Sequence, residues 1–231
     1  MRSQTGLALG VVWYVAFVVS IVCHEAAHGL AAWRLGDSTA RGLGLVTLNP
    51  LPHIQREPVG MLAAPVATYV MGGWMIGWAS TPISADWAQR NPKQAALVGL
   101  SGPAANLLLV VLAGLLIRIG IAAGVFARPG AVEFVRVVNG NGGFWSALAT
   151  GISILFTLNL LLFVFNLIPV PPLDGTSLVE LLLSGRALEV YRVIMSQPGV
   201  QAIGIVIAWM LLRFLYAPAL TTALRVLYPG R

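Results

Sequence analysis

Five long apolar stretches divide this chain and constrain its fold more than any other feature of the sequence. A helix that crosses a bilayer needs about 20 residues, so each stretch is long enough to cross or enter the membrane. Only 10% of the 231 residues are charged, whereas soluble domains carry about 25%. The sequence therefore predicts an all-α polytopic membrane protein, a single domain over residues 1–231 with about five to six membrane-embedded segments. The stretches lie at about 6–33, 58–79, 94–117, 144–168 and 199–227.

Two segments are not expected to form straight helices. The 58–79 stretch holds two prolines and four glycines, which favour a broken or re-entrant segment. The tract at about 43–48, Leu43-Gly44-Leu45-Val46-Thr47-Leu48, alternates between residue types. This alternation predicts a short strand-like element at the membrane edge, which could pair with an extended peptide.

The first apolar stretch contains the motif His24-Glu25-Ala26-Ala27-His28. Glu25 is the only charged residue between Ser3 and Trp33, and burying a carboxylate in hydrocarbon costs about 2.5–3.5 kcal/mol on insertion scales. Side chains four residues apart share one face of a helix, so both imidazoles could bind one zinc ion while Glu25 activates its bound water. The alternative is a buried polar cluster that bridges helices.

A second lone carboxylate, Asp174, follows the fourth apolar stretch. It is the only charged residue between Val137 and Val179, and it ends a proline-broken turn that begins at Asn166. Such a turn could present a metal ligand, although an Asp-Gly turn at a helix end is common in itself. If Asp174 is to meet the two histidines, the 58–79 segment should enter and leave the membrane on the same side.

Three motifs in this order resemble those of the site-2 protease family of intramembrane zinc metalloproteases. They are residues 24–28, Gly102-Pro103-Ala104-Ala105-Asn106, and the segment from Asn166 to Asp174-Gly175, and the resemblance covers about residues 6–185. It implies one zinc ion (Zn²⁺) per chain held by His24, His28 and Asp174, with Glu25 as general base. It also implies that Asn106 and Asn166 lie near the scissile peptide. Gly102 and Pro103 could instead mark a kink with close helix packing.

The resemblance also implies partners and a location. Family members cut peptide bonds within or near transmembrane segments of single-span proteins or signal-peptide remnants. We expect a multi-pass protein of a prokaryotic cell membrane, with the active site nearer the cytoplasmic side. The 118–143 loop and the tail after Tyr228 leave no room for the PDZ or CBS domains of larger relatives. The 14 Lys and Arg residues are scattered, which favours contact with the lipid bilayer and not with nucleic acid.

Some alternatives stay open. His53 could be an interfacial histidine in a proline-rich turn, or an auxiliary residue that contacts substrate, senses pH or binds metal. The chain could be a non-catalytic protein that binds transmembrane helices, although a pure binder would not need Glu25. A metal transporter is less favoured, because transporters usually show internal repeats and this sequence shows none. The sequence leaves the oligomeric state undetermined.

Overall fold

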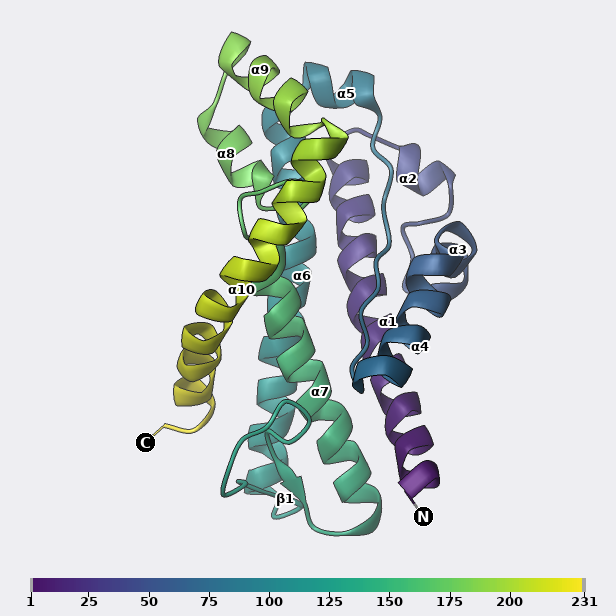
Figure 1. The fold of residues 1–231 in the computed structure, drawn as a ribbon, viewed down its shortest axis with the longest axis vertical. Helices are drawn as coiled ribbons and strands as arrows, with labels where there is room; N and C mark the ends of the chain where they lie inside the picture. The colour runs from purple at the N-terminus through teal and green to yellow at the C-terminus, as the bar shows by residue number, and fades with distance from the viewer. Residues whose placement is uncertain (1, 230–231) are drawn as a thin grey trace. The chain divides into compact units, whose positions relative to one another are not determined.

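Four long apolar helices dominate the computed structural model, which describes the backbone of residues 2–229 and the side chains of residues 6–229. Each of the four has the length and hydropathy needed to cross a bilayer. Many of their large apolar side chains are exposed, Phe214 at 61% and Ile119 at 64% among them, as suits a surface that lipid covers. The predicted all-α polytopic fold is confirmed. The helices are α1 (Arg2–Arg34), α6 (Pro92–Ala122), α7 (Gly143–Asn166) and α10 (Pro198–Leu227) (Figure 1).

Shorter elements fill the connections. The helical ones are α2 (Thr39–Gly42), α3 (Pro50–Arg56), the π-helical turn η1 (Val59–Ala63), α4 (Ala64–Gly72), α5 (Ala85–Arg90), α8 (Thr176–Leu182) and α9 (Gly185–Met195). Two strands, β1 (Phe126–Ala127) and β2 (Asn139–Gly140), pair antiparallel in the loop between α6 and α7. The chain forms two compact units. Unit 1 holds Met1–Cys23, Thr47–Ser80 and Leu107–Asn159, and unit 2 holds His24–Val46, Thr81–Asn106 and Leu160–Arg231.

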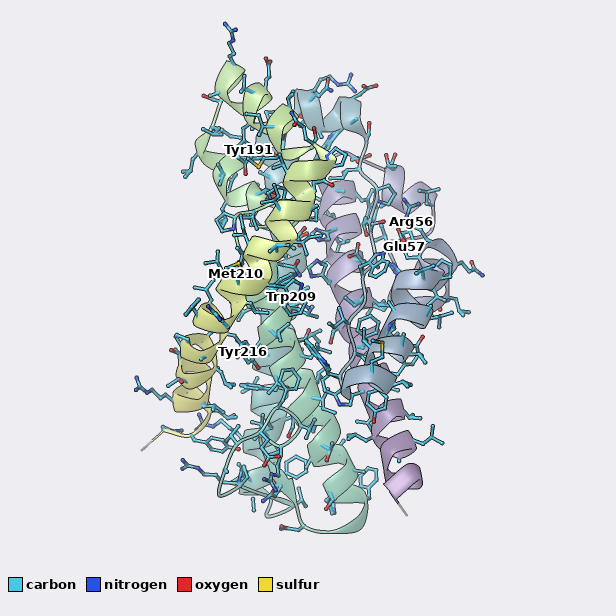
Figure 2. The ribbon with its side chains drawn as sticks, in the orientation of Figure 1. Arg56, Glu57, Tyr191, Trp209, Met210 and Tyr216 are labelled. Carbon is cyan, nitrogen blue, oxygen red and sulfur yellow. The ribbon has the colours of Figure 1, made fainter. Side chains whose placement is uncertain are left out.

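The 58–79 segment of unit 1 folds back on itself. It begins with η1 and α4, and the chain then returns in extended form, where the Trp78 amide donates to the Gly60 carbonyl at 3.2 Å. At the base of the fold, Arg56 Nε donates to the Ser80 carbonyl at 3.2 Å, and Ser80 Oγ donates to Glu57 Oε1 at 2.6 Å. Figure 2 labels Arg56 and Glu57 at the end of α3. The two ends of the segment thus lie together, as a re-entrant element requires. Its helical part, Val59–Gly72, is shorter than the helices that could cross a membrane.

The prediction of a strand at about 43–48 is wrong. Gly44 ends α2 with a φ of +71°, its amide donates to the Arg41 carbonyl at 3.0 Å, and the Leu45 amide donates to the Ala40 carbonyl at 2.9 Å. These two bonds make a Schellman cap, in which an apolar residue after the glycine packs back on the helix. Leu45 is that residue and is 2% exposed. The alternation therefore reflects a helix cap followed by bends, and it provides no strand edge for a substrate.

Unit 2 has two small apolar clusters that position its functional segments. Ala32 of α1, Trp87 of α5 and Val98 of α6 form one cluster with Ala95. The second joins the turn after α7 to α10 through Ile168, Leu173 and Ala208, and the ring centroids of Phe165 and Trp209 lie 5.5 Å apart beside it. Figure 2 labels Trp209 on α10. The turn that carries Asp174 is therefore anchored on a long helix.

Candidate active site

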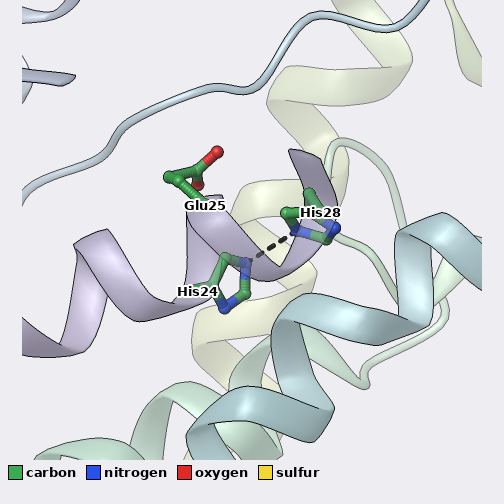
Figure 3. Close-up of side chains that lie close together, drawn as sticks. All are labelled: His24, Glu25 and His28. Carbon is green, nitrogen blue, oxygen red and sulfur yellow. Dashed lines mark hydrogen bonds between the residues drawn. The ribbon is translucent and has the colours of Figure 1, made fainter. Parts of the chain in front are cut away.

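Helix α1 places His24, Glu25 and His28 together. The Nε2 atoms of the two histidines lie 3.0 Å apart, and their rings meet edge to face with centroids 4.7 Å apart (Figure 3). One ligand atom from each of the three residues lies within 4.8 Å of the other two. All three side chains are buried, with exposed fractions of 6%, 5% and 9%. The helical spacing predicted from the sequence therefore produces a compact cluster of potential metal ligands.

The turn after α7 brings Asp174 to the same place. Prolines at 169, 171 and 172 lack the amide that would continue the helix, and the turn closes when the Leu173 amide donates to the Val170 carbonyl at 3.0 Å. Gly204 of α10 lets this turn approach closely, because a Cβ there would lie 1.8 Å from the Pro171 carbonyl oxygen. Asp174 Oδ2 then lies 3.0 Å from His24 Nε2 and 3.5 Å from His28 Nε2.

These three atoms fit a zinc ion. Tetrahedral zinc with bonds of about 2.0–2.1 Å holds its ligand atoms about 3.3 Å from one another. The three separations are 3.0, 3.0 and 3.5 Å, so the donors form a triangle of the required size. Two imidazoles and one carboxylate are also a usual ligand set for a catalytic zinc, which leaves a fourth position for water. All three residues belong to unit 2.

Hydrogen bonds orient both imidazoles. Asn106 Oδ1 lies 2.6 Å from His24 Nδ1, and the Val98 carbonyl oxygen lies 2.8 Å from His28 Nδ1. Each Nδ1 can donate to its oxygen, and this tautomer leaves the Nε2 lone pair free for a metal. Asn106 is fully buried. The structure thus shows that Asn106 contacts His24. Its expected position near the substrate stays a prediction.

Gly102 provides the space in which the imidazoles meet. A Cβ on this residue would lie 2.3 Å from His28 Nε2 and 2.5 Å from His24 Nε2. Contacts below 3.0 Å do not occur for real Cβ atoms, so a larger residue would displace both nitrogens. The motif at 102–106 therefore contributes to the site in two ways. Gly102 leaves space for the imidazoles, and the Asn106 amide oxygen bonds His24.

Glu25 has a partner that the sequence analysis did not identify. Thr81 Oγ1 lies 2.7 Å from Glu25 Oε2 and 3.0 Å from the Glu25 carbonyl oxygen. Thr81 belongs to the extended chain before α5, where it carries no recognisable motif. Its position beside α1 depends on tertiary structure, so no local sequence signal could have revealed it.

The two remaining candidate residues have different surroundings. Asn166 is the last residue of α7 and is partly buried, and its side-chain amide has no hydrogen-bond partner within the described part of the chain. Its predicted role near the scissile peptide stays a prediction. His53 lies in unit 1, where it is 2% exposed and its Nε2 is 3.1 Å from the Thr47 carbonyl oxygen. This local contact gives one nitrogen of the buried ring a partner, and an auxiliary role stays a prediction.

Comparison with known proteins places the chain in a family. The model of peptidase family M50 matches residues 12–211. The chain belongs to this family, the site-2 proteases. Together with the four apolar helices, this membership makes the chain an integral membrane protein. The resemblance predicted from the three motifs is therefore confirmed over most of the sequence.

Relatives in bacteria carry names that point to zinc. The chain is 33% identical to Bacillus subtilis YwhC over 167 residues, which are 72% of this chain and 66% of the relative. It is 33% identical to Mycolicibacterium smegmatis Rip2 over 180 residues, 78% of this chain and 60% of the relative. Both relatives are named as candidate zinc metalloproteases. The matches span less than two thirds of either relative's own length. No solved structure matches the chain significantly.

Proposed function

We propose that this chain is a zinc-dependent endopeptidase that hydrolyses peptide bonds within or near transmembrane segments. The observation that carries the proposal is the triangle of His24 Nε2, His28 Nε2 and Asp174 Oδ2, with separations of 3.0–3.5 Å and Glu25 beside it. Membership of the site-2 protease family and the names of the relatives support the same activity. One zinc ion per chain would be held by these three residues.

The residues divide the chemistry between them. Zinc, when bound, would acidify a water molecule and polarise the substrate carbonyl. The Glu25 carboxylate takes a proton from that water and later delivers it to the amine of the departing peptide. Asn106 and the Val98 carbonyl hold the two imidazoles in the productive tautomer during both steps. The Asn166 amide, which is free of protein partners among the described residues, is placed in our proposal against the backbone of the substrate.

The substrates we propose are single-span membrane proteins or signal-peptide remnants. A transmembrane helix keeps its peptide bonds in i→i−4 hydrogen bonds, so the substrate must unwind locally before the carbonyl can reach the site. Burial of Glu25 and both histidines at 5–9% exposure suits a site shielded from lipid and bulk water. We place this site nearer the cytoplasmic side of a bacterial membrane.

Metal content and cleavage test the proposal together. Purified wild-type protein should contain about one zinc per chain, and Asp174→Ala should lose most of it, since catalytic zinc needs three protein ligands. The exposed Asp86 on α5 offers a matched control, because Asp86→Ala removes a carboxylate that belongs to neither the histidine cluster nor its ion pairs. Glu25→Gln should keep its zinc and fail to cleave a reconstituted single-span substrate. Full zinc content in Asp174→Ala, or normal cleavage by Glu25→Gln, would contradict the proposed site.

A further inference from the structure

The buried carboxylate of Glu25 needs a partner, and the structure supplies one from outside helix α1. Glu25 is 5% exposed, and a buried carboxylate without hydrogen bonds is strongly destabilised. Thr81 Oγ1 approaches Oε2 at 2.7 Å, the distance of a charge-assisted O–H···O bond. A hydroxyl donates one proton, so it bonds either this oxygen or the Glu25 carbonyl, which lies 3.0 Å away. Within the described chain, Thr81 bonds only one oxygen of the carboxylate, Oε2, and not Oε1.

The local backbone keeps Thr81 extended. Pro82 follows it, and the residue before a proline avoids the helical region because its backbone clashes with the proline ring. The segment from residue 79 to residue 84 has no helix or strand of its own. Thr81 therefore depends on anchors at neighbouring positions to stay beside Glu25.

Asp37 provides such an anchor by binding Ser84, which lies three residues after Thr81. Its Oδ2 accepts the Ser84 amide at 2.8 Å, while its Oδ1 accepts the amide and the hydroxyl of Thr39 at 3.0 and 2.6 Å. Burial raises the pKa of the Asp37 carboxyl, but the hydrogen bonds from Thr39 and Ser84 outweigh burial and lower it. Asp37 is thus an anion at neutral pH, which strengthens the bond to Ser84.

Further hydrogen bonds hold both Asp37 and Ser84 in position. The Asp37 amide donates to the Ala32 carbonyl at 2.8 Å, which ties the residue to the end of α1. Ser84 begins α5 as its N-cap, where its Oγ accepts the Trp87 amide at 3.3 Å. Trp87 is buried in the apolar cluster with Ala32 and Val98. The extended segment is therefore tied to α1 directly at Glu25, and to the end of α1 through Asp37, which bonds Ala32.

From these contacts we infer that Thr81 is a positioning residue for the general base Glu25, and that Asp37 holds the Thr81 segment in place. This inference rests on the proposed function, because it assigns Thr81 a role only if Glu25 transfers the proton. Among the described residues, the Thr81 hydroxyl bonds Glu25 and none of the three proposed metal ligands. It acts by restricting the carboxylate to one orientation, with Oε2 occupied and Oε1 directed to the water. Loss of the bond would let the side chain leave that orientation, which lowers the rate without removing zinc.

Two substitutions at one position test the inference. Thr81→Val keeps the shape of the side chain and deletes the donor, whereas Thr81→Ser keeps the donor. Thr81→Val should lower kcat about 10- to 100-fold, the range for partners outside the ligand shell, with KM and zinc content close to wild type. Thr81→Ser should recover most of the lost rate. Thr221→Val on α10 removes a hydroxyl that bonds only its own helix, and it should leave kcat unchanged.

The outcomes separate this inference from the proposed function. Wild-type kcat in Thr81→Val, while Glu25→Gln is inactive, overturns the role of Thr81 and leaves the protease assignment intact. Loss of zinc or of the folded state in Thr81→Val, or failure of Thr81→Ser to recover activity, overturns it in favour of a structural role. Cleavage by Glu25→Gln would instead contradict the function on which the inference rests.

Discussion

Gly102→Ala should abolish zinc binding while leaving the fold intact. The added Cβ would lie 2.3 Å from His28 Nε2 and 2.5 Å from His24 Nε2, whereas ordinary contact begins at 3.4 Å. The two nitrogens must therefore move by about 1 Å, and a metal site tolerates deviations of only about 0.2 Å in its ligand distances. Since the displacement exceeds this tolerance about five-fold, we expect less than a tenth of the wild-type zinc content.

The same substitution should not weaken helix α6 itself. Alanine is a better helix former than glycine by about 0.5–1 kcal/mol, and the closest contacts of the new Cβ are imidazole atoms, not backbone. Circular dichroism should therefore show wild-type helix content in Gly102→Ala, and elemental analysis should show the missing zinc. The two measurements together distinguish a blocked metal site from a misfolded protein.

Gly151→Ala provides the matched control. Gly151 lies within apolar helix α7, and its added Cβ would meet Val12 Cγ1 at 3.6 Å, an ordinary contact. This variant should keep its zinc and its activity. If Gly102→Ala bound one zinc per chain as tightly as the wild type, the arrangement of the imidazoles around Gly102 would be wrong.

Two further substitutions test other parts of the structure. Asn106→Ala removes the oxygen that accepts from His24 Nδ1, so zinc affinity measured by chelator competition should fall about 10- to 100-fold; unchanged affinity would show that Asn106 does not orient the imidazole. Gly44→Ala places a Cβ at a φ of +71° and should lower the free energy of unfolding by about 1–2 kcal/mol, without loss of zinc. A neutral effect on stability would contradict the helix cap that replaces the predicted strand.

The apolar spans and the first half of the site could be predicted from sequence because their causes are local. A helix satisfies its own backbone, so a run of about 20 apolar residues is sufficient to predict α6 or α7. Within one helix, the four-residue spacing of His24 and His28 determines that they share a face. Asp174 was predicted as a ligand because a lone carboxylate in an apolar, proline-broken segment needs an explanation.

The strand predicted at 43–48 shows where local patterns mislead. Alternation of Leu with Gly has the period of a strand, but Gly44 adopts a positive φ and caps α2. Period alone does not distinguish an apolar residue on a strand from one that packs back on a helix cap. For Leu45, the hydrogen bond to the Ala40 carbonyl decided between the two.

By itself, the sequence determined the membrane class and the shared face of His24 and His28, because these depend on composition and on spacing within one helix, and its three motifs identified the family by resemblance. Tertiary structure alone decided that Gly102 makes room for the imidazoles, that Val98 and Asn106 orient them, and that Thr81 holds Glu25. Val98 lies 70 residues from His28, and Thr81 lies 56 residues from Glu25. Such contacts arise from the packing of separate segments, which no local pattern of residues encodes.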